Sequence, residues 1–263
     1  MALNPSRILR RLQRNIVCNL TLRSRWCSSL LRPAAPIRLR NYPCASSPAC
    51  RLIVFLPGIG DILEDYEFYG FIDAIRQCRI SADMIAADMH FGYYLRRTAI
   101  ERLREDVILP AQRKGYGEID LVGISLGGFG ALYYAMNHPG EIARLFLLAP
   151  YLGEQPVVRE ICTAGGVKKW QPANVADADY ERKLWLWLKS YDSQSPTFPS
   201  LYLGYGLQDK FASANQLLAD RLPGAHVHRI PGKHDWPTWI RLWHAILAQI
   251  EPSSAACRDS RSA

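Results

Sequence analysis

The stretch Glu118-Ile-Asp-Leu-Val-Gly-Ile-Ser-Leu-Gly-Gly-Phe-Gly-Ala-Leu-Tyr-Tyr-Ala135 predicts a strand, an abrupt turn and a helix. Residues 119–122 are a short apolar run, typical of a buried strand. Residues 123–127 then match the pattern G-x-S-x-G, in which a serine occupies a strained turn between a strand and a helix. The pattern therefore predicts Ser125 as a nucleophile displayed at the end of a strand.

The glycines of this pattern have a steric purpose. In so sharp a turn the residues two before and two after the serine, Gly123 and Gly127, approach each other closely, and a Cβ atom on either would clash. A five-residue match is common by chance in glycine-containing loops. Here the match lies between an apolar strand and a helix, which is the context that the turn requires.

Apolar strands alternate with helix-length segments along residues 36–251. Strands of this kind indicate a parallel sheet that helices cover on both faces. Ligands of such sheets bind at the carboxyl ends of the strands. The predicted strands are 51–56, 80–87, 119–122, 145–149, 201–205 and 225–230, with a peripheral strand over 36–42, and the predicted helices include 64–77, 99–114 and 129–137.

Residues 152–198 interrupt this alternation with several Trp, Tyr and Pro residues and mixed charges. We interpret them as a mostly helical lid inserted over the strand ends. Trp170 and Trp185 of the insertion, with Tyr151 just before it, are the candidate substrate-binding residues. The alternative is that these aromatic side chains form the core of a small subdomain.

The formal charge of +8 belongs to one end of the chain. Residues 1–51 contain ten arginines and no acidic residue, and the remainder has 22 Lys and Arg against 24 Asp and Glu. The nearly neutral body does not favour nucleic-acid binding. Residues 1–35 are either an organellar transit peptide, a segment that lies on an anionic membrane, or an extension without a targeting function. We favour the extension and a cytoplasmic location, and expect residues 252–263 to be a frayed tail.

The length and composition of the chain predict one domain of about 215 residues. No stretch approaches the roughly 20 apolar residues of a membrane-spanning helix, so we expect this domain to be soluble. The seven cysteines form no C-x-x-C pair and no Cys/His spacing typical of zinc sites. We therefore expect neither a disulfide framework nor a bound metal.

A serine hydroxyl needs a base to take its proton, and the base needs an acid to orient it. Asp209 and His234 each follow a predicted strand, and the order Ser, Asp, His is that of α/β-hydrolases. The other histidines fall within a strand, on helices or before Ser125. The oxyanion of the reaction needs backbone N–H donors, which we assign to Leu126 and to Ile59 in the loop Pro57-Gly-Ile-Gly60.

Taken together, these segments resemble the α/β-hydrolase superfamily. Within it, the motifs G-x-S-x-G-G-x-G-A and H-D-W-x-x-W are similar to those of the group of esterase D, feruloyl esterases and mycolyltransferases. The resemblance covers about residues 51–251 and implies nucleophile Ser125, acid Asp209, base His234, an ester or thioester substrate and no cofactor. It departs from many members at Pro57, where they have a histidine, and in the insertion.

The sequence thus predicts a serine carboxylesterase that acts through an acyl-enzyme on small-molecule esters. One alternative is an acyltransferase with the same three residues, and another is a hydrolase-fold module that binds without catalysis. Nucleic-acid binding through the arginine-rich leader is a third. The sequence leaves the oligomeric state and the physiological ester open.

Overall fold

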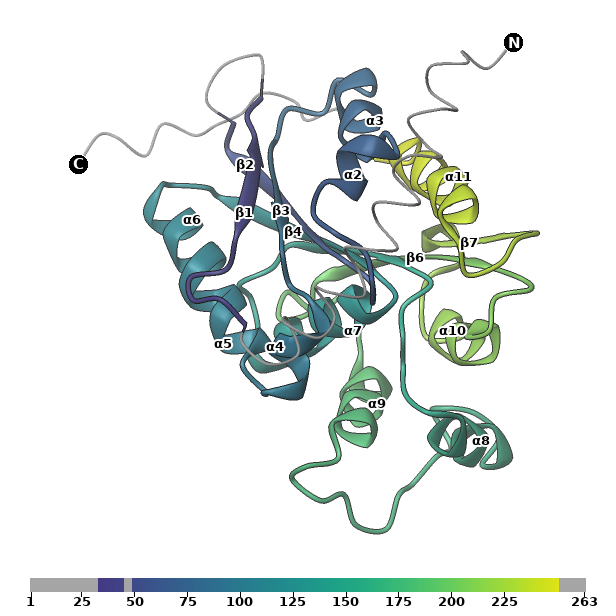
Figure 1. Cartoon of the computed structure of the whole chain (residues 1–263). Coiled ribbons are helices and arrows are strands. Elements are labelled where there is room, and N and C mark those ends of the chain that lie inside the picture. The colour runs from purple at the N-terminus through teal and green to yellow at the C-terminus, as the bar shows by residue number, and fades with distance from the viewer. Residues whose placement is uncertain (1–32, 45–48, 251–263) are drawn as a thin grey trace.

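A computed structural model describes residues 33–44 and 49–250 of the chain (Figure 1). At its centre lies a seven-stranded sheet with the strand order β1-β3-β2-β4-β5-β6-β7. β1 runs antiparallel to β3, and the other neighbouring pairs are parallel, which confirms the predicted mostly parallel sheet. The strands are β1 (Leu39–Tyr42), β2 (Arg51–Leu56), β3 (Asp83–Ala87), β4 (Glu118–Ile124), β5 (Arg144–Leu148), β6 (Ser200–Gly206) and β7 (Val227–Ile230).

Helices cover both faces of the sheet (Figure 1). α3 and α11 lie on one face, and α7 lies on the other. The helices are α2 (Asp65–Phe68), α3 (Phe71–Gln77), α4 (Phe91–Leu95), α5 (Ala99–Leu103), α6 (Leu109–Arg113), α7 (Leu126–Asn137), α8 (Gln155–Thr163), α9 (Tyr180–Ser190), α10 (Ala212–Ala219) and α11 (Trp236–Leu247), with the π-helical turn η1 (Arg104–Ile108) and the 3₁₀ turn η2 (Gly224–His226).

The structure divides one predicted helix. Residues 64–77 form two helices, α2 and α3, because Gly70 between them has a left-handed φ of 81°. Such a conformation is open to glycine and ends a right-handed helix. In contrast, the predicted segment 99–114 stays helical throughout, through α5, η1 and α6.

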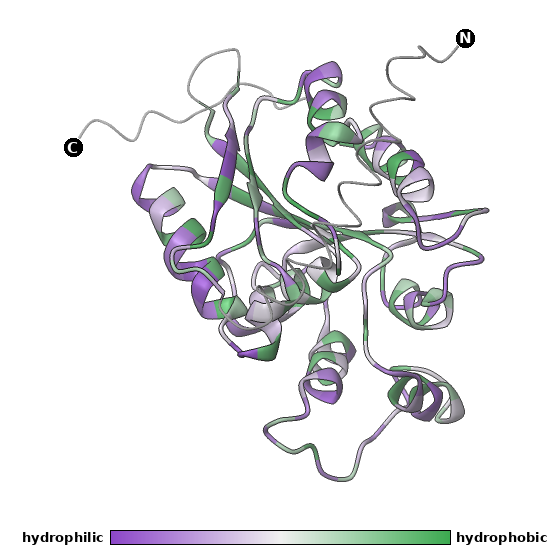
Figure 2. Ribbon diagram, viewed as in Figure 1, coloured by the Kyte–Doolittle hydropathy of each residue, from purple (hydrophilic) through white to green (hydrophobic). Residues whose placement is uncertain are grey.

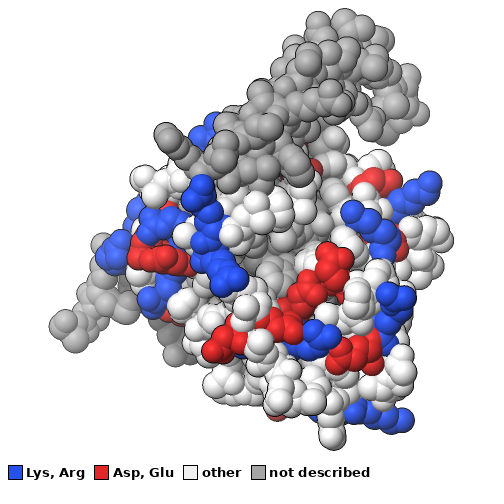
Figure 3. All heavy atoms as spheres, turned by 60° about the horizontal axis from the view of Figure 1, so that its bottom comes forward, with Lys and Arg blue, Asp and Glu red and all other residues white. Residues whose placement is uncertain are grey.

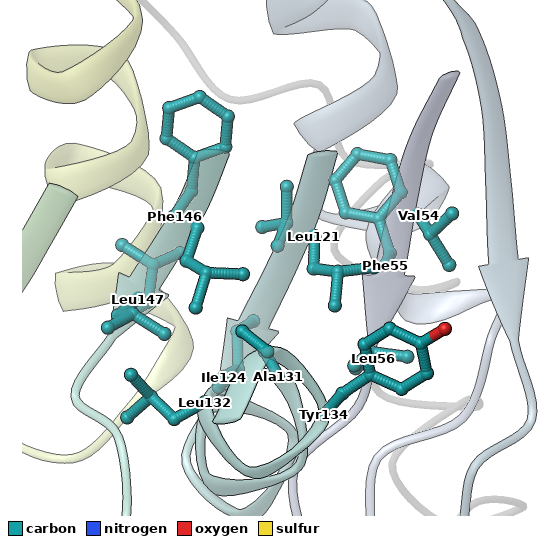
Figure 4. Close-up of a cluster of buried hydrophobic side chains, with 14 of the residues drawn as sticks. Val54, Phe55, Leu56, Leu121, Ile124, Ala131, Leu132, Tyr134, Phe146 and Leu147 are labelled. Atoms are coloured by element: carbon teal, nitrogen blue, oxygen red, sulfur yellow. The ribbon is translucent and has the colours of Figure 1, made fainter. Parts of the chain in front are cut away.

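The core lies between the central strands and the helices on each face. β2 is buried at every residue, and β4 and β5 are buried along most of their length. Ala131 and Leu132 of α7 pack on one face of these strands (Figure 4). On the other face, the Trp243 ring of α11 stacks on Phe71 with 5.6 Å between ring centroids. In Figure 2 the central strands are largely green, whereas β1 at the edge of the sheet is largely purple.

Asp120 lies at the amino end of β4, opposite the end that carries Ser125. Its side chain is fully buried, and it accepts hydrogen bonds from Arg51 and Arg144. A buried carboxylate is tolerated only when it is paired in this way. Asp120 therefore links strands β2, β4 and β5 and takes no part in the edge where ligands bind.

Residues 152–198 contain α8 and α9 and project beyond the strand ends (Figure 1). Within the described ranges, no helix combines the length and apolarity needed to cross a membrane. Cys50 is disulfide-bonded, which the cysteine spacing did not predict, whereas Cys78 and Cys162 are free thiols. The predicted leader, apart from residues 33–35, and the predicted tail lie outside the described residues.

Candidate active site

Ser125 is the only residue between β4 and α7. Its φ of 51° and ψ of −114° lie in a region that residues with a side chain rarely adopt, and such strain is common at functional sites. The carbonyl oxygen of Ser125 accepts hydrogen bonds from the backbone N–H groups of Gly128 and Tyr151. These bonds hold the turn in place and leave the hydroxyl at the carboxyl edge of the sheet.

Two glycines make this turn feasible. A Cβ atom on Gly123 would lie 2.5 Å from the carbonyl oxygen of Gly127. A Cβ atom on Gly127 would lie 2.0 Å from the carbonyl oxygen of Leu56, at the end of β2. Both separations are far below van der Waals contact, so the close approach expected from the sequence is present.

Ser125, His234 and Asp209 come together from three strand ends. His234 Nε2 lies 2.9 Å from Ser125 Oγ, and His234 Nδ1 lies 2.8 Å from Asp209 Oδ2. Both distances are those of hydrogen bonds. The Asp209 carboxylate is fully buried, and its second oxygen accepts the backbone N–H of Phe211 at 2.8 Å. The carboxylate is thus fixed on one side by its own turn and on the other by the imidazole.

Three other histidines have partners elsewhere. His226 Nδ1 lies 3.1 Å from the carbonyl oxygen of Leu201, and His228 Nε2 lies 3.1 Å from Gln249 Oε1. His90 caps the amino end of α4. Their positions agree with the choice of His234 that the chain order indicated.

The His234 ring is held between two aromatic side chains. Phe211 and Trp239 both stand edge-on to it, with centroids 5.0 and 5.1 Å away. The loop that carries His234 leads directly into α11, whose first turn is capped by the Asp235 side chain. Packing and capping together restrict the rotation of the imidazole, so that it points at Ser125.

The loop after β2 lies beside Ser125. A Cβ atom on Gly58 would be 3.3 Å from Ser125 Cβ, which is a tight contact and shows how closely this loop approaches the serine. Among the described residues, the N–H groups of Ile59 and Leu126 have no hydrogen-bond partner. Leu126 directly follows Ser125 in the chain, and Ile59 directly follows Gly58, which lies against the serine.

The model of the esterase family matches residues 108–250, more than half of the chain, and a model of the α/β-hydrolase fold matches residues 51–161. The chain belongs to the esterase family. It is a carboxylesterase-type hydrolase of the α/β-hydrolase superfamily, as the motifs indicated. A search of curated proteins found no match to the chain.

Solved structures share the fold of this esterase. S-formylglutathione hydrolase from Staphylococcus aureus is 15% identical, with a TM-score of 0.56 over 82% of this chain and 92% of that one. The fluorophosphonate-binding serine hydrolase F of the same organism is 14% identical, with a TM-score of 0.54 over 82% and 94%. Est1E from Butyrivibrio proteoclasticus is 16% identical, with a TM-score of 0.53 over 81% and 93%.

The aromatic residues that we expected to bind substrate differ in their placement. Trp170 and Trp185 are buried in the interior of the esterase's insertion, with 2% and 0% of their surface exposed. Their indole N–H groups donate to Glu160 and to the carbonyl oxygen of Leu152. Burial leaves these two side chains no surface that a substrate could contact. Their positions match the alternative interpretation, in which they form a small core.

Tyr151 lies closer to the reactive residues than the two tryptophans. Its backbone N–H donates to the carbonyl oxygen of Ser125, and its ring centroid lies 5.5 Å from that of Phe211. The Tyr151 hydroxyl donates to Glu181 of α9, and burial together with this bond raises the pKa of the phenol. Tyr151 therefore joins the edge of the site to the insertion.

A contact that the sequence did not reveal joins the loop after β2 to the histidine loop. Trp236 Nε1 donates to Asp61 Oδ1 at 3.0 Å. Burial and the nearby charge of Asp65 raise the pKa of Asp61 to about 7, although the bond from Trp236 opposes this shift. The signal in the sequence is weak: Asp61 ends the Gly-Ile-Gly-Asp turn, and Trp236 follows His234 by two residues.

The described residues hold no cluster of three or more His, Cys, Asp or Glu side chains that could bind a metal ion. Acidic and basic side chains are interspersed on the face shown in Figure 3, rather than forming one continuous basic surface. That distribution resembles the near-neutral balance of the body of the chain.

Proposed function

We propose that the chain is a serine esterase that cleaves carboxylic esters or thioesters through an acyl-enzyme. The hydrogen-bonded series from Ser125 through His234 to Asp209 carries the proposal, because each distance suits proton transfer or orientation. Ser125 Oγ attacks the ester carbonyl carbon while its proton passes to His234 Nε2. Asp209 stabilises the imidazolium that forms and keeps Nδ1 as the protonated nitrogen.

The intermediate then collapses. The bond from the carbonyl carbon to the leaving oxygen or sulfur breaks, and His234 gives its proton to the leaving group. Water next attacks the acyl-enzyme, losing a proton to His234, and the bond to Ser125 breaks as the acid leaves and the proton returns to Oγ. The N–H groups of Ile59 and Leu126 would stabilise the negative charge on the carbonyl oxygen in both halves of the reaction.

The insertion at residues 152–198 has a role in this proposal. Tyr151 ties it to the turn at Ser125, and Tyr180 of α9 reaches toward the outer side of α7, where its ring centroid lies 5.5 Å from that of Tyr133. The insertion would therefore act as a lid that shields the acyl group from water.

Labelling with a fluorophosphonate probe tests the proposal. The wild-type protein should gain one adduct on Ser125, located by peptide mapping, and the Ser125→Ala variant should gain none while keeping its circular dichroism spectrum. Product analysis with an added alcohol or thiol separates hydrolysis from acyl transfer. A folded wild-type protein that stays unlabelled and cleaves no ester would contradict the proposal and favour a binding module.

A further inference from the structure

A cavity of about 520 Å³ lies along the outer side of α7. Its walls come from α7, from the segment containing α4 and α5, and from the start of α9, and they include Tyr94, Ile100, Phe129, Tyr133 and Tyr180. We call it the α7 groove. Its volume lies within the range of roughly 300–1,000 Å³ typical of small-molecule sites.

The α7 groove begins one helical turn from the proposed nucleophile. Phe129, at its near end, follows Ser125 by four residues, and its backbone N–H donates to the Ser125 carbonyl oxygen at 3.3 Å. The Phe129 ring lies 5.9 Å from that of Tyr151, which in turn packs on Phe211 beside His234. A series of three aromatic rings, those of Phe129, Tyr151 and Phe211, thus leads from the groove to His234.

The walls near Ser125 are apolar. Phe129 stacks on Tyr133 at 5.6 Å, and Tyr133 meets Tyr180 edge-on at 5.5 Å. The hydroxyl of Tyr94 is turned toward the helix, because a Cβ atom on Gly130 would lie only 2.2 Å from it. The ring of Tyr94, rather than its hydroxyl, is therefore the part that can face the groove.

Two of the charges at the groove already have partners. Arg104 donates to both carboxylate oxygens of Glu141, and Glu105 pairs with Arg102. Arg97 lies over the ring of Tyr180, with 5.3 Å from its guanidinium carbon to the ring centroid. At the far end the lining becomes polar, with Asn137 and His138. The apolar part of a ligand lying along α7 would therefore end where the lining becomes polar, at Asn137 and His138.

The geometry points to the α7 groove as the site of the substrate's acyl chain, and to an apolar acyl group of about eight to twelve carbons. The inference rests on the proposed serine esterase function. From Phe129 to Asn137 the helix rises by about 12 Å, and one further turn of about 6 Å separates Phe129 from Ser125. An extended chain that advances ~1.3 Å per carbon needs about five carbons to cross that turn and about nine more to reach Asn137, so a chain of about eight to twelve carbons ends within the groove, short of its polar end.

A series of 4-nitrophenyl esters, from acetate to myristate, tests the assignment on the full chain. For the wild-type protein we expect kcat/KM to rise about fourfold per methylene between four and ten carbons, because each buried methylene adds binding in the transition state. Beyond about twelve carbons the rise should end. A profile that peaks at acetate would overturn the assignment.

Two groove variants and a control locate the effect. Ile100→Trp narrows the groove and should lower kcat/KM for the decanoate ester at least tenfold relative to kcat/KM for the acetate ester. Tyr133→Ala adds space without overpacking and should shift the optimum to longer chains. Leu186→Trp, at an exposed aliphatic residue of α9 outside the lining, should behave like wild type.

The outcomes separate the two proposals. If acetate is cleaved and the chain-length profile is identical in wild type, both groove variants and the control, the groove assignment is wrong and the esterase proposal stands. If no ester is cleaved and Ser125 takes no fluorophosphonate, the esterase proposal fails and the groove assignment falls with it.

Discussion

Replacing Asp61 by Asn should change how stability depends on pH. The pKa of Asp61 is raised from 3.8 to about 7, first by burial and then by the charge of Asp65. Between pH 4 and pH 7 the folded protein therefore holds a proton that the unfolded chain has released. Unfolding releases that proton, so the free energy of unfolding falls as pH rises through this interval and levels off above it.

The magnitude follows from the shift. Each unit of pKa corresponds to 1.36 kcal/mol, so a shift of about three units makes the wild-type protein up to about 4 kcal/mol less stable at pH 8 than at pH 4 through this group alone. In Asp61→Asn that loss is absent, and the amide oxygen still accepts the hydrogen bond from Trp236. Relative to wild type, the free energy of unfolding of the variant should therefore increase by about 2–4 kcal/mol as the pH rises from 4 to 8.

Urea unfolding at pH 4.5, 6, 7 and 8 measures the effect, and subtracting wild type from variant at each pH removes the contributions that the two proteins share. Asp73→Asn is the matched control, because this carboxylate of α3 is 65% exposed. The difference in the free energy of unfolding between Asp73→Asn and wild type should not change with pH. A flat difference for Asp61→Asn as well would refute the reasoning, since it would mean that Asp61 titrates as it does in the unfolded chain.

Two further substitutions test the site and the turn that carries it. Asp209→Asn keeps a polar side chain beside His234 but removes the buried charge that would stabilise the imidazolium, so kcat for a short ester should fall about 10³- to 10⁴-fold with an unchanged circular dichroism spectrum. Gly127→Ala places a Cβ atom 2.0 Å from the Leu56 carbonyl oxygen and should cost at least about 3 kcal/mol in urea unfolding. Its control is Gly117→Ala, where the nearest atom is 3.9 Å away, and equal stability of the two variants would contradict the steric argument.

Much of the fold was readable from the sequence because its signals are local. Continuous apolar strands alternate with helix-length segments, and a serine between two glycines marks one turn. The order of Ser125, Asp209 and His234 could then be matched to strand ends without knowing any distance. One break escaped this reasoning, since Gly70 has a left-handed φ that an apolar periodicity cannot reveal.

The remainder depends on contacts between distant parts of the chain. Tryptophans in the insertion suggested substrate contact, but a sequence does not say which way an indole faces, and Trp170 and Trp185 face inward. The α7 groove is likewise formed by three separate segments, of which only α7 adjoins the serine in the sequence. No periodicity within any one of them shows that the others leave a space.

The link between Asp61 and Trp236 explains how two distant loops keep one geometry. Trp236 stacks on Tyr69 at 4.2 Å and meets Phe71 edge-on, so its indole is held by the helices next to the loop after β2. Its N–H then binds Asp61, three residues from Gly58, which lies against Ser125. His234 precedes Trp236 by two residues, so this hydrogen bond also anchors the loop that carries the imidazole. The desolvation of the Asp61 carboxyl group and the strained φ of Ser125 are local costs of this arrangement, and the packed strands β2, β4 and β5 offset them.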